Sequence, residues 1–422
     1  MAHARRRFLA LPMLIVLLVA ALPAATAGAA GPTVRFGTFN ASLNRNAAGQ
    51  ALADMSVPGN AQADAVAEII QRVRPDILLI NEFDYEPNNA LATAFQANYL
   101  SVSHHGTAPI EYPYVFVAPS NTGISSGFDL NNNGVTDTTP GDGSYGDDSF
   151  GFGLFPGQFG LAVFSRYPID YDSIRTFQYF LWKDMPGAML PDDPATPAPA
   201  DWYSTAELAV FRLSSKSHWD VPIQIGRKTV HFLVSHPTPP VFDGPEDRNG
   251  TRNNDEIRFW ADYITPGPTS SYVYDDDGGR GGLAANQLFV IAGDQNSDPL
   301  DGDSVPGSIQ QLLNNPLVNT SVAPSSAGGP YWADVQDALN DTHRSDPAFD
   351  TADFCDTPAF PPCSGPGNLR ADYVLPRRSI RIAGSGIFWP TASDPLVYLT
   401  GAGFPVPSSD HRAVWVDVNL PG

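Results

Sequence analysis

Short apolar runs that each end in a polar cluster recur along the chain. Seven of them show the β-branched and aromatic bias of buried strands. The runs are TVRFGTFNAS (33–42), DILLINEFD (76–84), GLAVFSRYPI (160–169), TVHFLVSHP (229–237), QLFVIAGDQNSD (287–298), ADYVLP (371–376) and RAVWVDV (412–418). Helix-like segments lie between them at 61–75 and 254–264, and Pro75 stops the first. The alternation predicts an α/β protein whose sheets are covered by helices.

Polar side chains gather where these runs end. The set comprises Asn40, Glu82, His236, Asp294, Asn296, Asp372, Asp410 and His411. In α/β folds the loops beyond strand ends place side chains around one shared pocket. Thiolates and a Gly-rich dinucleotide turn are missing from the set, whereas carboxylate and amide oxygens suit Mg²⁺, Mn²⁺ or Ca²⁺. The pattern therefore favours a site for a hard divalent cation.

Each of these residues, taken singly, also fits an ordinary turn or ion pair. Glu82 could pair with Arg72 or Arg74, and the segment 294–296 could be a plain turn after a strand. The joint order of the residues and their place at strand ends favour a site instead. Asp410 and its neighbour His411 would point to opposite sides of an extended chain, so another carboxylate must orient the imidazole.

The N-terminus indicates export. Residues 1–30 contain three arginines, an apolar run too short to span a bilayer comfortably, and small residues around 25–27. We expect a secretory signal peptide and an extracellular protein, with an uncleaved membrane anchor as the alternative. No later stretch is apolar enough to span a membrane. We expect residues 31–422 to form one catalytic domain and the protein to be a monomer.

The chain is strongly acidic. Its formal charge is −21, and removal of residues 1–30 leaves 21 basic against 45 acidic residues, a charge of −24. Binding of a polyanion across a broad basic face is disfavoured, because such binding depends on clustered Lys and Arg. Lys216, His218, Arg248 and Arg252 could grip a phosphate, but we expect them to pair with surplus acidic residues at the surface.

Two cysteines, Cys355 and Cys363, flank the Pro-rich loop CDTPAFPPC. In an exported protein they are expected to form a local disulfide. A metal site is the weaker alternative, because no histidine or third cysteine lies nearby.

A segment that begins at residue 129 imitates the start of a calcium loop. Its D-x-N-x-N-G pattern places Asp129, Asn131, Asn133 and Asp137 at alternating positions. The usual closing Glu is missing, so a solvated turn and a structural Ca²⁺ site are equally compatible with it.

Seven fragments resemble, in order, the motifs of the endonuclease/exonuclease/phosphatase superfamily, which contains deoxyribonuclease I, exonuclease III, neutral sphingomyelinases and inositol-polyphosphate 5-phosphatases. They are TFNAS for T-x-N, NEFD for the Glu motif, GLAVFSRYPI for the SRYPI strand, SHPTPP for S-x-H, GDQNSDP for GD-x-N, ADYVLP for R-x-DY-x-L and SSDHRAVWVDV for SDH. The resemblance runs from about Thr33 to Val418. It departs at Gln295, where the family usually has an aromatic residue, and in a Gly/Asp-rich insertion around 119–158.

The resemblance implies a four-layered α/β/β/α sandwich of two mixed β-sheets flanked by helices. It also implies a divalent metal, with Mg²⁺ as first choice and Mn²⁺ or Ca²⁺ as alternatives. Asn40 and Glu82 would bind this metal, and Asp410 would be a further ligand or an orienting group.

The same resemblance assigns catalytic roles. Asp294 would orient or deprotonate the attacking water, and Asn296 would hold a phosphate oxygen. Asp372 would align His411 as an acid/base dyad, and His236 would contact the phosphate or the leaving oxygen. Either Asp294 or His411 could be the general base, since family members are described in both ways.

These roles imply a secreted phosphoester hydrolase, most of all a nuclease-like phosphodiesterase. The strong acidity fits a phospholipid headgroup or a small phosphoester better than a polymer, because a compact headgroup needs only a local site. A non-catalytic binding protein on the same fold is the remaining alternative, and it would require missing motif residues. None is missing.

Overall fold

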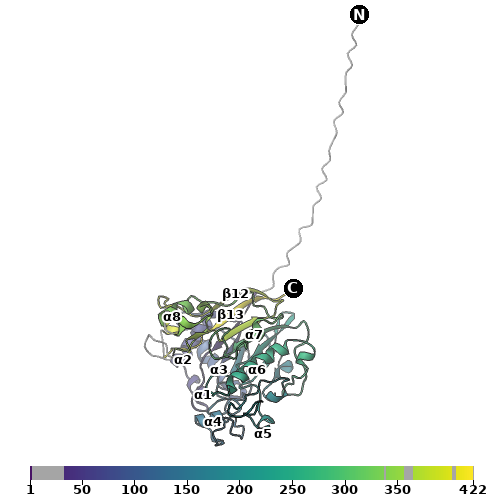
Figure 1. Ribbon diagram of the computed structural model, residues 1–422. Helices are drawn as coiled ribbons and strands as arrows, with labels where there is room; N and C mark the ends of the chain where they lie inside the picture. The colour runs from purple at the N-terminus through teal and green to yellow at the C-terminus, as the bar shows by residue number, and fades with distance from the viewer. Residues whose placement is uncertain (2–32, 337–338, 356–364, 402–404, 422) are drawn as a thin grey trace.

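Two mixed β-sheets packed face to face form the centre of the protein, and helices cover their outer faces in the computed structural model (Figure 1). From residue 33 to residue 421 the structure describes the chain except for 337–338, 356–364 and 402–404. The predicted four-layered α/β/β/α sandwich is confirmed. The expected signal peptide at 1–30 lies outside the described residues and stays a prediction.

The first sheet has the strand order β12-β13-β1-β2-β4-β3 and the second β11-β8-β7-β6-β5. The first comprises β12 (Arg381–Ile387), β13 (Val414–Asn419), β1 (Thr33–Asn40), β2 (Ile77–Asn81), β4 (Leu161–Ser165) and β3 (Tyr114–Phe116). The second comprises β11 (Asp372–Pro376), β8 (Leu288–Asp294), β7 (Lys228–Val234), β6 (Trp219–Ile225) and β5 (Arg175–Thr176), and β9 (Ala352–Asp353) pairs separately with β10 (Asn368–Leu369). Only the pairs β1–β2 and β7–β8 are parallel among the described strands, so in each sheet two neighbouring strands have their carboxyl ends at the same edge.

Eight α-helices are present in the described part of the chain. They are α1 (Gln50–Met55), α2 (Ala61–Val73), α3 (Ala90–Phe95), α4 (Gly143–Asp147), α5 (Thr205–Leu208), α6 (Arg248–Tyr263), α7 (Gln310–Leu313) and α8 (Gly328–Gln336). The side chain of Asn60 accepts a hydrogen bond from Ala63 N at the start of α2, and left-handed Arg74 followed by Pro75 ends it. None of the described helices is both long and apolar enough to cross a bilayer.

Alternate residues of each strand enter different cores. On β1, Phe36 lies between the sheets, while Phe39 packs beneath the helices on the other face. On β8, Val290 lies between the sheets and Ile291 packs toward α6. The rings of Phe36 and Phe232 meet across the interface with their centroids 5.5 Å apart. This period of two therefore decides which strand-end residues face the other sheet.

The predicted elements are present, but the prediction was incomplete. All seven predicted strands are found in the structure, and the predicted runs did not include β3, β5, β6, β9, β10 and β12. The helix expected at 254–264 begins earlier, at Arg248. Its first turns are polar and yet buried, since Arg252 is 6% and Asn253 0% exposed. Apolar periodicity could not find a buried helical face made of polar side chains.

The inter-sheet core allows a stability prediction. We expect Phe232→Ala to lower the free energy of unfolding by about 3–5 kcal/mol, because Phe232 is fully buried and its ring contacts Phe36. Urea titration measures the change. Val57→Ala, at a position that is 61% exposed, is the control and should change the value by less than about 0.5 kcal/mol. Equal effects for both variants would contradict the packing of the two sheets.

Candidate active site

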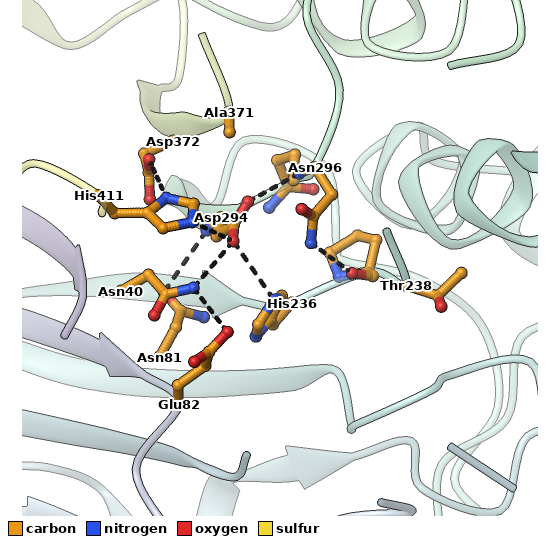
Figure 2. A network of polar contacts seen from close by, with 12 residues as sticks. Asn40, Asn81, Glu82, His236, Thr238, Asp294, Asn296, Ala371, Asp372 and His411 are labelled. Carbon is orange, nitrogen blue, oxygen red and sulfur yellow. Dashed lines mark hydrogen bonds and ion pairs between the residues drawn. The ribbon is translucent and has the colours of Figure 1, made fainter. Parts of the chain in front are cut away.

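The site lies at the edge where the parallel strands of the two sheets end (Figure 2). Asn40 is the last residue of β1 and Asp294 the last of β8, and both continue the strand positions that face the other sheet. Asp372 opens β11 and stands opposite Asp294 in the strand ladder. His236 follows two residues after β7. Residues from four separate strands therefore meet at one point.

Asp294 is the centre of this arrangement. Its Oδ2 atom lies 3.1 Å from Asn40 Nδ2, 3.3 Å from His236 Nε2 and 3.5 Å from His411 Nε2 (Figure 2). Its Oδ1 atom accepts a 2.8 Å hydrogen bond from Asn296 N. Burial opposes the charge of this carboxylate, but His411, His236 and Asn40 together hold the pKa of Asp294 well below its usual value. Asp294 is therefore an ionised carboxylate placed between two imidazoles.

His411 lies between two carboxylates. Its Nδ1 atom is 2.9 Å from Asp372 Oδ2, which also accepts a 2.8 Å hydrogen bond from Thr351 Oγ1. Its backbone N–H donates to Ser409 Oγ at 3.0 Å. Burial acts to lower the pKa of His411, but the charges of Asp372 and Asp294 outweigh it and hold this pKa well above the usual value. The orienting carboxylate thus comes from Asp372, and the ring carries a positive charge at neutral pH.

Ligand atoms of Asp294, Asp372 and His411 lie within 4.8 Å of one another, so this buried group could hold a metal ion. A second acidic pair, Glu82 and Asp410, lines the cavity that opens over these residues. Glu82 has a left-handed backbone (φ 57°), which turns its side chain away from the direction that its strand position gives. Burial of its carboxylate, followed by the negative charge of Asp410, raises the pKa of Glu82 to about 7.

Among the described residues, Glu82 and Asp410 have hydrogen bonds with Asn40, Ser42 and Ser409, and neither carboxylate forms an ion pair with a lysine or arginine. Asn40 Nδ2 donates to Glu82 Oε1 at 3.1 Å, but an amide cannot neutralise two carboxylates. A divalent cation would do so, and all three side chains offer the oxygen donors that hard cations prefer. The residues Asn40, Glu82 and Asp410 therefore fit a metal chemically. The alternative partners of Glu82 are engaged elsewhere, because Arg72 pairs with Glu68 and Arg74 donates to the Ala108 carbonyl.

His236 and Asn296 complete the predicted set. Burial, assisted by the positive charge of Lys216, lowers the pKa of His236 to about 4, so this ring is neutral. Its Nδ1 atom is buried without a hydrogen-bond partner among the described residues. Asn296 has a left-handed backbone (φ 50°), and its Nδ2 atom donates to the Pro237 carbonyl at 3.0 Å. All eight residues of the predicted cluster thus lie in one group around Asp294.

Three important residues escaped the sequence prediction. Asn81 ends β2 on the inter-sheet face, where its Oδ1 accepts from Asp294 N at 3.4 Å and its Nδ2 donates to the Ser235 carbonyl at 3.3 Å. The position of Asn81 on the predicted strand could have identified it as a site residue. Lys216 was expected to pair at the surface, but it is only 7% exposed and lines the cavity. Glu256, on α6, is fully buried.

Glu256 connects the segment that carries Lys216 to the loop that follows His236. Its carboxylate accepts hydrogen bonds from Ser215 N and Thr238 N, both at 2.7 Å. Three of the four cations expected at the surface are in fact buried: Lys216, His218 and Arg252. The fourth, Arg248, pairs with Glu246 as expected. The partners of the buried Arg252 and His218 are distant in sequence, since Arg252 donates to the Phe150 carbonyl and His218 Nε2 contacts the Glu256 carbonyl, and such residues give no local signal.

A cavity of about 910 Å³ opens over this cluster. Its walls include Glu82, His236, Asp294, Asn296, Asp410 and His411. The insertion at 119–158 contributes Leu130, Gly146, Asp147, Ser149 and Phe152 to the same walls. The insertion therefore shapes the cleft in front of the polar residues.

The expected calcium loop forms a hydrogen-bonded turn. Asp129, Asn131 and Asn133 accept hydrogen bonds from backbone N–H groups of the loop, and Asp137 N donates to Asp148 Oδ2 at 2.7 Å. These bonds are those of an ordinary turn, and Ca²⁺ binding stays a prediction. The expected Cys355–Cys363 disulfide also stays a prediction, because Cys363 lies outside the described residues.

The fold and the site together define an α/β/β/α protein with an acid and imidazole cluster at its sheet ends. The sequence matches the Endonuclease/Exonuclease/phosphatase family over residues 37–411, so the chain belongs to this family. Its members are hydrolases of phosphoester bonds that depend on a divalent metal. No curated protein sequence matches the chain.

Several solved structures are similar at low sequence identity. One is the endonuclease/exonuclease/phosphatase from Beutenbergia cavernae DSM 12333, with 15% identity, coverage of 92% of this chain and 72% of that chain, and a TM-score of 0.47. The human Nocturnin catalytic domain with bound sulfate has 12% identity, coverage of 93% and 96%, and a TM-score of 0.44. Beta toxin from Staphylococcus aureus has 12% identity, coverage of 91% and 99%, and a TM-score of 0.40.

His218 beside Glu256 gives a pH prediction. Its Nε2 donates to the Glu256 carbonyl at 2.9 Å and its Nδ1 accepts from Ser214 Oγ at 2.8 Å, while burial lowers the pKa of His218 to about 4. Because the folded pKa is below the unfolded value near 6.5, the stability from this group is complete above that value and is lost as pH falls toward 4. We expect unfolding free energy to fall by about 2 kcal/mol more in the wild type than in His218→Gln between about pH 7 and pH 4.5.

Urea unfolding at the two pH values measures this difference, so that any cost of the substitution itself at neutral pH cancels. An equal pH dependence in both proteins would contradict the buried, neutral state of His218.

Proposed function

We propose that this protein is a metal-dependent phosphodiester hydrolase that acts outside the cell after removal of residues 1–30. The main support is the environment of Asp294, an ionised carboxylate between two imidazoles on the wall of a large cavity. A phosphodiester resists attack because its oxygens are negative and its leaving alkoxide is basic. Hydrolysis therefore needs positive charge at the phosphoryl oxygens and a positioned water. The cavity offers residues for both tasks.

Asn40, Glu82 and Asp410 are the residues that would hold the metal, with Mg²⁺ as first choice and Mn²⁺ or Ca²⁺ as alternatives. When bound, the cation would neutralise negative charge on the phosphoryl oxygens. Neither Glu82 nor Asp410 forms an ion pair with a lysine or arginine of the described chain, which supports this assignment. The chemistry of three oxygen donors supports a hard cation over zinc.

Asp294 and His411 share the proton chemistry in this proposal. Asp294 is ionised and can accept a hydrogen bond from the attacking water, orient it and take its proton as the new bond to phosphorus forms. The negative charges of Asp372 and Asp294 hold the pKa of His411 well above its usual value, which favours the role of general acid for this ring. Asp372 fixes its Nδ1–H, which leaves Nε2–H directed into the site to protonate the leaving oxygen.

Three further groups would hold the phosphate. His236 is neutral and lies beside Asp294. Lys216 lies buried on the wall of the same cavity, where burial lowers the pKa of its ammonium group and the negative charges of Glu256, Glu82 and Asp294 act to raise it. Asn296 would contact a phosphate oxygen, as the resemblance implies. A phosphoryl oxygen beside Lys216 would be a further negative partner for this side chain.

Substitution of the central residues should abolish turnover without unfolding the protein. We expect Asp294→Ala and His411→Ala each to lower the rate by about 10²–10⁴-fold, because each loses a proton-transfer group. Initial rates on a chromogenic phosphodiester and circular dichroism measure the two properties. The exposed carboxylate of Asp172 provides the control, and Asp172→Asn should keep the wild-type rate. A near-normal rate in either alanine variant would remove that residue from the mechanism.

Metal removal tests the cation directly. We expect a chelator to stop hydrolysis and Mg²⁺ or Mn²⁺ to restore it, in a panel of plasmid DNA, RNA, sphingomyelin and inositol phosphates. We also expect Glu82→Gln, which removes one ligand charge, to raise the Mg²⁺ concentration for half-maximal rate by about 10–100-fold. Titration of the rate against Mg²⁺ measures this shift. Full activity in chelator, or an unchanged Mg²⁺ requirement in Glu82→Gln, would overturn the metal assignment.

A further inference from the structure

The cavity over Asp294 continues into an apolar region, which we call the aromatic cleft. Its residues are Phe152, Phe159, Pro239, Pro240, Val241 and Phe242. Phe242 is 85% and Phe152 51% exposed, although both belong to the wall of the same cavity as the polar residues. Exposed rings at such a wall are favourable binding surface, because a bound apolar group removes them from water.

The backbone at Phe242 is held in place at a cost. Phe242 (φ 67°) and Phe159 (φ 55°) both have left-handed backbones, which bulky residues rarely adopt. The Val241 carbonyl accepts a 2.7 Å hydrogen bond from Asn249 Nδ2, and Asn249 N donates to Asp243 Oδ2 at 2.7 Å. The start of α6 therefore fixes the loop that presents Phe242.

Two glycines allow close packing around Phe152. A Cβ atom on Gly146 would lie 2.7 Å from the ring of Phe152, so the ring rests directly on this glycine. A Cβ atom on Gly151 would lie 1.8 Å from the Ser215 carbonyl oxygen, so the insertion packs closely against the segment that carries Lys216. Phe152 and Lys216 thus belong to one packed unit on the cavity wall.

The cavity has little free positive charge. Arg252 donates to the carbonyls of Leu213, Phe150 and Arg212, and Arg248 pairs with Glu246. Among the described residues that line the cavity, Lys216 is the cation whose side chain makes no hydrogen bond or ion pair with the described chain. A single lysine side chain can pair with one phosphate group.

Acidic side chains occupy the rest of the polar wall. Asp147, Asp298, Asp301 and Asp303 line the cavity. The neighbouring phosphates of a polynucleotide would meet these carboxylates, and the chain as a whole is strongly acidic. The electrostatics therefore favour a substrate with a single phosphate.

We propose that the substrate is a small phosphodiester with one phosphate and one apolar or aromatic ester group. The phosphate faces Lys216 and Asp294, and the apolar group lies against Phe152 and Phe242. A nucleoside ester or a phospholipid would supply this chemistry. The inference rests on the proposed function, and it adds a substrate class and two rings that select it.

Two synthetic diesters with the same leaving group test the proposal on the full mature chain with Mg²⁺ or Mn²⁺. They are methyl p-nitrophenyl phosphate and phenyl p-nitrophenyl phosphate. In both, the water oxygen forms the new bond to phosphorus and p-nitrophenolate leaves with the electron pair of the broken bond. We expect kcat/KM to be at least about tenfold higher for the phenyl ester, because only this ester fills the aromatic cleft.

Variants separate the cleft from the catalytic groups. Phe242→Ala and Phe152→Ala should lower the phenyl-over-methyl preference at least about threefold, mainly through KM for the phenyl ester. Gly146→Ala should do the same by displacing the ring of Phe152. Tyr171→Ala, at a remote and 50% exposed aromatic residue outside the cavity wall, should keep the wild-type preference. Thermal unfolding confirms that each variant is folded.

The outcomes distinguish the two proposals. Metal-dependent hydrolysis of both esters with a preference that the variants leave unchanged overturns the aromatic cleft and keeps the proposed function. Faster cleavage per phosphate of an oligonucleotide than of the phenyl ester overturns the single-phosphate substrate. If neither ester is hydrolysed, the proposed function fails. Calorimetric titration with diphenyl phosphate and dimethyl phosphate then tests whether the aromatic cleft binds an apolar group. Equal affinities for the two compounds would overturn the aromatic cleft.

Two further esters with the same p-nitrophenolate leaving group identify the source of the apolar group. Faster hydrolysis of thymidine 5′-p-nitrophenyl phosphate than of dihexanoylglycerol p-nitrophenyl phosphate supports a nucleoside ester, and the reverse supports a phospholipid. Loss of the faster activity in Phe242→Ala is expected in either case. Retention of that activity in Phe242→Ala and Phe152→Ala would overturn the role of the rings.

Discussion

The buried charge of Asp294 is the constraint around which the site is built. An ionised carboxylate in a protein interior is costly unless hydrogen bonds and opposite charges compensate it. Here the compensation comes from both sheets, because Asn40 belongs to β1 while His236 follows β7. His411 adds its positive charge from the segment that precedes β13. Any shift between the sheets would remove a partner from Asp294, so the contact that serves the chemistry also fixes how the sheets meet.

Backbone strain is concentrated at the same cavity. Glu82, Phe159, Phe242 and Asn296 all line it, and all have left-handed backbones without being glycine. Each such residue costs about 1–3 kcal/mol and persists only where surrounding contacts impose it. Stability is thus reduced locally in favour of side chains that point into one cleft. For Glu82 the turn is needed because its strand position would direct it toward the helices.

Charge distribution explains how an acidic protein can handle a phosphate. Its formal charge of −21 repels polyanions at long range, while the few cations near the site are buried and local. Lys216 is buried and faces the cavity, where burial lowers the pKa of its ammonium group and nearby carboxylates act to raise it. Glu256 keeps this lysine segment and the His236 loop together. The single-phosphate substrate proposed above rests on this restricted placement of positive charge.

The sequence by itself determined the layered fold and most of the cluster. Strand periodicity and order placed Asn40, His236, Asp294 and Asp372 where the sheets end, since a period of two directs side chains to one face. The same strand-end pattern included Glu82 and His411, and the motif resemblance added roles for the cluster, which remain proposals. The geometry of adjacent residues argued against Asp410 as the orienting partner of the imidazole, and the resemblance named Asp372, whose Oδ2 lies 2.9 Å from His411 Nδ1.

Only the tertiary structure decided burial and partnership. Lys216 and His218 read as surface cations, because nothing nearby in sequence shows that Glu256 on α6 packs against them. The insertion likewise gave no local sign that it would close one side of the cavity through Gly146 and Phe152. Sequence patterns encode which face a residue takes within its own element. Contacts between elements far apart in the chain depend on packing, and packing exists only once the sheets and helices have assembled.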